Sequence, residues 1–215
     1  MWIWILLAAA LGYAVSRVAL GYPRPAQRFH SLFRFEVAFL TGAAEATFPA
    51  GGEIPPSGLE ADVPAYTDQL LTASHPRMRL LMHLLFFLVE HGTLFFPAPG
   101  PGGWRRFSAL AADQRAAALE GWRTSRLFPR RLVFASLRAI LTMGYFAFPP
   151  VLRQLGLAPY EVRTPVVEAD LWYPRIGASR SSLRLSPADL TPPSDGRPIP
   201  LDSPLHPAYR KRSAR

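Results

Sequence analysis

Prolines and Pro/Gly loops divide the first three quarters of this 215-residue chain into short segments. Within each segment apolar residues recur at the three- and four-residue spacing of an amphipathic helix. The breaks are Pro49, Pro76, residues 97–103, and Pro149 with Pro150. This pattern predicts an all-α fold, a small bundle of four or five helices between Arg34 and Gly156 with no sheet.

Prolines and capping residues locate the ends of the predicted helices. Asp62 is expected to cap a helix that has proline in its first turn. Ser108 is expected to cap a later helix, which continues to about Leu127. Pro129 is expected to open the helix after that one. Gly156 is expected to end the last helical turn in a left-handed conformation.

The amino-terminal segment from Trp2 to Tyr22 is almost entirely apolar and roughly as long as the ~20 residues that cross a bilayer. We therefore predict a single-pass transmembrane anchor over residues 1–22. A cleavable signal peptide is the alternative, but no basic stretch precedes the apolar core. Arginines at 24, 28 and 34 follow the segment, so the positive-inside rule places the body in the cytoplasm, with the periplasmic side as the alternative.

A second apolar run covers residues 80–96 but contains His83, Glu90 and His91. We interpret it as a central helix buried on nearly all sides by protein rather than as a membrane span. Arg79, His83 and Glu90 fall on one stripe, which either packs on a partner, faces solvent, or forms a metal or proton site. The eight-residue spacing of the two histidines is poor for joint chelation, so no metal residues are predicted.

The chain changes character after residue 160. Residues 161–215 contain nine prolines, show no helical period and end in a basic run. Such a segment cannot bury enough apolar surface to fold by itself, yet it carries Leu171, Trp172 and Tyr173. We therefore predict three parts: an anchor over 1–22, a helical domain over 23–160, and an extended tail over 161–215 that lies along a partner.

Charge and composition restrict the function. Of the net charge of +9, residues 105–160 carry +7, and 23 of the 24 basic residues are arginine. Lysine-rich tails and aromatic-interleaved basic loops are missing, so nucleic acid is not a predicted partner. The chain has no cysteine, no glycine-rich phosphate loop, no nucleophile elbow and no paired carboxylates. It is therefore not predicted to be catalytic alone, and no catalytic or cofactor-binding residues are assigned.

Residues 107–160 resemble the small (gamma) subunit of gluconate 2-dehydrogenase, also called subunit 3. The resemblance rests on Phe107, Ser108, Leu110, Arg115, Leu119, Trp122, Ser125, Arg131, Phe134, Leu137, Arg138, Tyr145, Phe146 and Gly156. Upstream, residues 46–49 (ATFP) and the following Gly/Pro loop look like the family's opening segment, so the similarity spans about residues 35–160. This chain departs from the family in having no twin-arginine export signal and in its tail.

The resemblance implies an accessory subunit without a cofactor of its own. Such a subunit binds, stabilises and membrane-tethers an FAD-dependent oxidoreductase of the glucose–methanol–choline (GMC) type. The FAD then belongs to the partner, which oxidises an alcohol, sugar acid or sterol-like substrate, with a cytochrome or quinone as the electron acceptor.

Large aromatic side chains beside arginines are typical of interface centres. The residues predicted to contact the partner are Arg115, Trp122, Arg130, Arg131 and Arg138 in the helical domain, with Leu171, Trp172 and Tyr173 in the tail. The alternative function is a stand-alone, membrane-anchored helical protein that binds an apolar ligand, with side chains of 78–96 and 132–148 lining the cavity.

Overall fold

The computed structural model describes residues 2–157, 164–174, 176, 177, 179, 181, 183–197 and 204–207. The chain divides into two compact units, Met1–Val151 and Leu152–Arg215, which are described separately. In the described residues the secondary structure is helical and contains no strand, which confirms the predicted all-α class.

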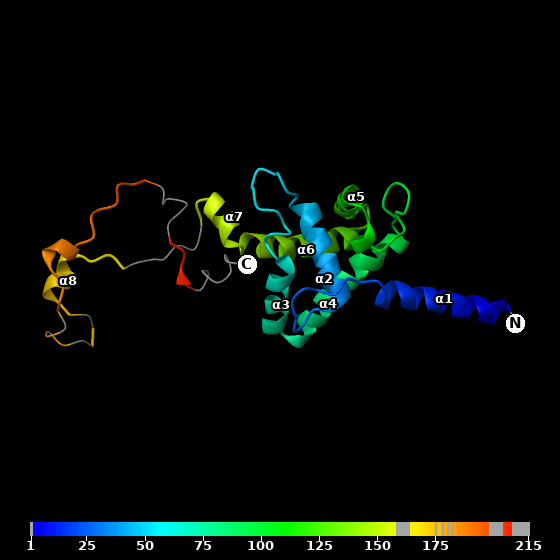
Figure 1. Cartoon of the computed structure of the whole chain (residues 1–215), viewed down its shortest axis with the longest axis horizontal. Helices are drawn as coiled ribbons and strands as arrows, with labels where there is room; N and C mark the ends of the chain where they lie inside the picture. The colour runs from blue at the N-terminus through cyan, green and yellow to red at the C-terminus, as the bar shows by residue number, and fades with distance from the viewer. Residues whose placement is uncertain are drawn as a thin grey trace. The chain divides into compact units, whose positions relative to one another are not determined.

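One helix, α2 (Arg34–Thr47), is the centre of the first unit (Figure 1). It contacts α3 (Val63–Ala73), α4 (Pro76–His91), α5 (Ala112–Arg123) and α6 (Phe128–Phe146). The core around these helices contains apolar side chains that are less than 2% exposed: Phe39, Leu40, Val63, Leu71, Phe86, Val89, Phe107, Leu137, Leu141 and Val151. A helical body is therefore present between residues 34 and 156, but with the short α7 (Pro149–Gln154) it contains six α-helices rather than the four or five predicted.

Small residues on α2 allow the close packing of this core. A Cβ atom on Gly42 would lie 2.8 Å from the guanidinium of Arg115, and one on Gly58 would lie 2.2 Å from the carbonyl oxygen of Ala44. The amide of Gly58 also donates to the carbonyl oxygen of Phe48 at 2.8 Å. The Gly/Pro loop after α2 can therefore fold back against the helix only because Gly58 carries no side chain.

Several predicted helix ends are confirmed. Asp62 has a left-handed φ of 47°, and its side chain accepts a hydrogen bond from the amide of Ala65 at the start of α3. Pro129 lies in the first turn of α6. Gly156 has a φ of 68° just after α7 (Pro149–Gln154).

The prediction that Ser108 caps a long helix is wrong. Ser108 lies in a short 3₁₀ turn, Phe107–Ala109, and both its amide and its hydroxyl bind the buried carboxylate of Glu90. Because Ser108 is used in this way, α5 starts only at Ala112, and it ends at Arg123 rather than near Leu127.

The prediction of a central, almost fully buried helix over residues 80–96 is also wrong. Phe86 and Val89 on α4 are buried, but Leu80, Leu84 and Leu88 are about half exposed. Phe86 and Val89 belong to the core that surrounds α2, whereas the leucines on the opposite side of α4 stay partly open to solvent.

The segment predicted as a transmembrane anchor forms helix α1 (Trp2–Ala19). In the part of the chain that the structure describes, no helix is long and apolar enough to cross a membrane, so the anchor predicted over residues 1–22 is not confirmed. Helix α1 contains 18 residues. Its carboxyl end is fixed to the bundle, because the guanidinium of Arg17 donates to the carbonyl oxygen of Trp104 and the hydroxyl of Thr93, both at 2.8 Å.

The second unit contains a five-residue helix, α8 (Glu168–Trp172), and a 3₁₀ turn, Pro187–Asp189. Two hydrogen bonds join the segments on either side of α8: the amide of Thr191 donates to the carbonyl oxygen of Val166, whose own amide donates to the hydroxyl of Thr191. The tail is therefore not extended throughout.

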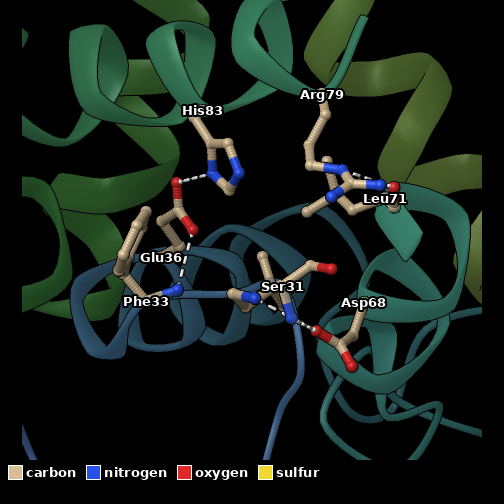
Figure 2. A network of polar contacts seen from close by, with 8 residues as sticks. Ser31, Phe33, Glu36, Asp68, Leu71, Arg79 and His83 are labelled. Atoms are coloured by element: carbon tan, nitrogen blue, oxygen red, sulfur yellow. Dashed lines mark hydrogen bonds and ion pairs between the residues drawn. The ribbon is translucent and has the colours of Figure 1, made fainter. Parts of the chain in front are cut away.

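Two buried carboxylates fix the segment that leads into α2 (Figure 2). Asp68 on α3 accepts hydrogen bonds from the amides of His30, Ser31 and Leu32 at 2.8–3.0 Å. Glu36 on α2 accepts from the amide of Phe33 through one oxygen, and its other oxygen lies 2.6 Å from Nδ1 of His83 on α4. The entry to α2 is thereby tied to two neighbouring helices.

We expect Asp68→Ala to lower the free energy of unfolding by at least about 3 kcal/mol, because it leaves three amide donors without their carboxylate. Urea unfolding followed by circular dichroism measures the change. Asp195→Ala, at an exposed position, is the matched control and is expected to change stability by less than about 0.5 kcal/mol. Equal effects of the two substitutions would contradict this role of Asp68.

Candidate functional site

Two hollows on the surface of the first unit are lined by distinctive sets of side chains. The first is a shallow hollow of about 590 Å³ on the outer side of α6. Its lining residues are Arg123, Arg131, Phe134, Ala135, Arg138, Ala139, Thr142 and Met143. The α6 residues in this set recur every three or four positions, so they form one helix face. The hollow is therefore cationic and apolar at once, and none of its lining residues is acidic.

The structure places two of the predicted interface arginines, Arg131 and Arg138, on this hollow. The guanidinium of Arg131 donates to the carbonyl oxygens of Ser125 at 2.8 Å and Arg126 at 3.1 Å. These hydrogen bonds attach the side chain of Arg131 to the loop before α6 and restrict the position of its charge. Arg138 lies further along the same face of α6, and its side chain is exposed.

The other predicted interface residues of the helical domain lie elsewhere. Trp122 is only 4% exposed and belongs to the core. Arg115 is mostly buried and forms an ion pair with Glu45 at 2.8 Å. Arg130 packs over the rings of Phe96 and Trp122, at 3.8 and 4.9 Å from their centroids, and burial lowers its pKa.

The predicted tail residues are in the second unit. Trp172 and Tyr173 at the end of α8 are 64% and 73% exposed, and Leu171 is partly buried. Exposed aromatic side chains of this size lose water-contacting area when a partner covers them, so their placement is compatible with a partner contact.

The second surface is an apolar pocket of about 830 Å³, and much of its lining comes from the two ranges, 78–96 and 132–148, named for the cavity of the alternative function. It is lined by Tyr13, Arg17, Val18, Leu84, Phe87, Leu88, His91, Gly92, Leu94, Phe95, Phe96, Trp122, Leu127, Pro129, Arg130 and Val133. One sequence signal was available: apolar residues lie on both faces of α4, which is more than one packed face requires.

Three polar side chains interrupt the apolar lining of this pocket. Both ring nitrogens of His91 are buried, and within the described residues neither has a hydrogen-bond partner. Burial, with the charges of Arg17 and Arg106, lowers the pKa of His91 to about 4, so its ring is neutral at pH 7. The Nε atoms of Arg17 and Arg130 are likewise buried and unpaired among the residues described.

A buried hydrogen-bond network around the carboxylate of Glu90 lies next to His91 on α4. One carboxylate oxygen of Glu90 accepts from the hydroxyls of Tyr22 at 3.0 Å and Ser108 at 2.6 Å, and the other accepts from the amide of Ser108 at 2.9 Å. Burial nevertheless raises the pKa of Glu90 to about 7, because these bonds only partly replace water. Arg106 lies over the ring of Tyr22, with its guanidinium carbon 3.8 Å from the centroid.

The polar stripe predicted on α4 faces other parts of the protein. Arg79 donates from Nε to the carbonyl oxygen of Leu71 at 3.0 Å, His83 contacts Glu36, and Glu90 contacts Tyr22 and Ser108 (Figure 2 shows the first two). In the described residues no group of three or more His, Asp or Glu side chains is placed to hold a metal ion.

No family model, no curated protein and no solved structure matches this chain. The resemblance to the gluconate 2-dehydrogenase small subunit therefore stays a prediction.

The raised pKa of Glu90 predicts a pH-dependent contribution to stability. The folded protein holds this proton up to about pH 7, whereas the unfolded chain releases it near pH 4.5. The contribution is therefore complete below pH 4.5 and is lost as the pH rises through about 7. Glu90→Gln removes the titration.

We expect the difference in unfolding free energy, wild type minus Glu90→Gln, to fall by roughly 3 kcal/mol between pH 4.5 and 8. Urea unfolding over this pH range measures it, and taking the difference cancels the titration of His91, which has the opposite sign. The exposed Glu120→Gln serves as a control with no such fall. A difference that is flat with pH would show that Glu90 titrates normally.

Proposed function

We propose that this protein is a non-catalytic accessory subunit that binds and stabilises an FAD-dependent oxidoreductase of the GMC type. The observation that supports the proposal most directly is the hollow on α6. It presents Arg131 and Arg138 on an apolar helix face with no acidic residue in its lining. Both arginines are among the residues that carry the resemblance to the small-subunit family.

The chemistry of this hollow suits an acidic, partly apolar partner surface. Arg131 is already ordered by its bonds to two carbonyl oxygens, so it loses little freedom on binding. Phe134 and Met143 on α6 line the same hollow and supply apolar area next to the charges. Arginine combined with apolar area is the composition that energetic centres of interfaces favour.

The proposed role assigns the redox chemistry to the partner. The FAD, the substrate and the cytochrome or quinone acceptor belong to the large subunit and its electron path, and this chain supplies a folded surface that covers part of the flavoprotein. The lipid bilayer, predicted as a further partner from the amino-terminal segment, stays a prediction.

The double substitution Arg131→Glu with Arg138→Glu is expected to reduce copurification of the flavoprotein at least about tenfold, because it reverses the charge of the contact. The measurement is a mild-detergent pull-down from the native host with an absorbance spectrum of the eluate, where a flavin spectrum reports the partner. The matched control, Arg24→Glu with Arg28→Glu, makes the same charge change at another hollow and should leave the flavin recovery unchanged. A wild-type eluate without flavin would overturn the proposed function.

The exposed aromatic residues of α8 are expected to add to the same contact. Trp172→Ala with Tyr173→Ala should weaken binding by a few kcal/mol, at roughly 1.5–3 kcal/mol for each large side chain that becomes buried. Titration of the purified flavoprotein against each variant measures the loss. Leu185→Ala with Leu190→Ala removes two exposed side chains from the same unit as a control. If both double variants bind like wild type, the tail does not contribute to the interface.

A further inference from the structure

The apolar pocket beside α4 is the centre of a larger apolar surface of the first unit. Four segments surround the pocket: the carboxyl half of α1, the outer side of α4, residues 92–96 and residues 127–133. Eight of the large apolar side chains that line it are more than a third exposed. We call this surface, which includes Tyr13, Leu84, Leu88, Phe95 and Leu127, the α1–α4 face. Contiguous apolar patches of this kind mark surfaces that contact a partner or a membrane.

The same segments carry large aromatic side chains that are open to solvent. Trp2 and Trp4 on α1 are largely exposed, and so are Phe95 and Phe128. Tryptophan combines a large apolar ring with one polar N–H group, and it is enriched where a membrane meets water. The surface therefore offers both aliphatic chains and rings of the interfacial type.

Hydrogen bonds hold the segments of the α1–α4 face in one arrangement. The guanidinium of Arg17 on α1 donates to the carbonyl oxygen of Trp104 and to the hydroxyl of Thr93, both at 2.8 Å. Arg106 donates to two carbonyl oxygens just after α1. Because the chain itself orders these segments, little further ordering is required when a partner covers them.

Exposed arginines lie on and beside the α1–α4 face. Arg77 comes about two and three helical turns before Leu84 and Leu88, so it shares their side of α4. Arg105 and Arg126 directly follow or precede exposed aromatic or apolar residues of the same surface. All three side chains are exposed, and within the described residues none of them forms an ion pair with Asp or Glu.

The segments that form this surface are almost free of negative charge. Residues 1–35, 76–112 and 121–160 contain a single acidic residue, Glu90, and its side chain is buried. A second copy of the chain would bring these positive charges against each other, which is unfavourable. Hydrocarbon chains below a layer of anionic headgroups match both features, because the pocket lining is almost entirely apolar and the arginines lie around it.

We propose that the α1–α4 face binds the surface of an anionic phospholipid bilayer. Its apolar side chains insert among the acyl chains, and Arg77, Arg105 and Arg126 bind the headgroup phosphates. This contact differs from the span that the sequence predicts over residues 1–22, since four segments of the first unit touch the lipid. It also does not rest on the proposed subunit role, because the hollow on α6 is lined by other residues.

The experiment measures how the purified full chain, freed of detergent, floats with lipid vesicles in a density gradient. One set of vesicles contains phosphatidylcholine alone, and the other contains phosphatidylcholine and phosphatidylglycerol in equal parts. We expect binding to the mixed vesicles to be at least about tenfold tighter, because several arginines meet anionic headgroups. Added salt should reduce this difference.

Two leucines of α4 test the insertion of the face. Leu84→Gln with Leu88→Gln keeps good helix formers and should weaken binding to the mixed vesicles at least about tenfold, because both side chains lose their transfer into hydrocarbon. Leu185→Gln with Leu190→Gln makes the same change at exposed positions of the second unit and should bind like wild type. Circular dichroism confirms that both variants are folded.

The arginines are tested by a triple substitution with a matched control. Replacing Arg77, Arg105 and Arg126 with glutamine should remove most of the preference for phosphatidylglycerol and leave binding to phosphatidylcholine unchanged. Replacing Arg123, Arg131 and Arg138, which line the hollow on α6, changes the net charge equally and should keep the preference.

Fluorescent labels show which residues enter the lipid. The chain has no cysteine, so a single introduced cysteine carries one environment-sensitive fluorophore. We expect labels at Leu88→Cys and Leu127→Cys to shift to shorter emission wavelengths when mixed vesicles are added. A label at Ala139→Cys, an exposed position in the hollow on α6, should not shift.

Three results would overturn the proposal. Wild-type binding by the folded leucine variant would show that the face does not enter the bilayer, as would an unchanged label at position 88. Equal binding to both kinds of vesicle would show that anionic lipid is not recognised. Loss of flavin recovery by the leucine variant, with vesicle binding intact, would assign the face to the flavoprotein. Vesicle binding needs no flavoprotein, so the two proposals fail independently.

Discussion

The first unit depends on buried carboxylates that are paired with backbone and side-chain groups of other segments. Asp68 binds three successive amides ahead of α2, and Glu36 binds an amide and His83. Glu90 binds Ser108 and the hydroxyl of Tyr22. A carboxylate taken out of water is costly unless its oxygens are satisfied, so each pairing requires the two segments to meet in one arrangement. These bonds fix where the loops run between the helices.

This arrangement leaves part of the apolar surface of α4 exposed. Its inward stripe carries Arg79, His83 and Glu90, which are all occupied by protein groups, and its contact with α2 buries Phe86 and Val89. The opposite face of this 16-residue helix carries Leu80, Leu84 and Leu88, which are about half exposed. That face is covered only at the edge by α1, and the space between them is the pocket. The open apolar surface is thus a direct result of how the polar stripe is oriented.

Both proposed activities use surfaces that the bundle leaves uncovered, and they differ in chemistry. The hollow on α6 carries fixed positive charge on an exposed helix face, which suits a large acidic partner. The pocket beside α4 is concave and almost entirely apolar. Neither surface requires a catalytic group in this chain.

The sequence by itself determined the helical class and most helix ends, because these depend on local chemistry. Asp62 as a cap and Pro129 in a first turn act through their own backbone, so a pattern can predict them. Tertiary structure alone decided the role of Ser108, which binds Glu90 instead of capping a helix, and the burial of Trp122 in the core. It also decided which face of α4 is buried and that, among the described residues, neither ring nitrogen of His91 has a hydrogen-bond partner, since both depend on residues far away in the chain. The helical period of a sequence shows which residues share a face of the helix. Only tertiary packing decides which of the two faces contacts other helices.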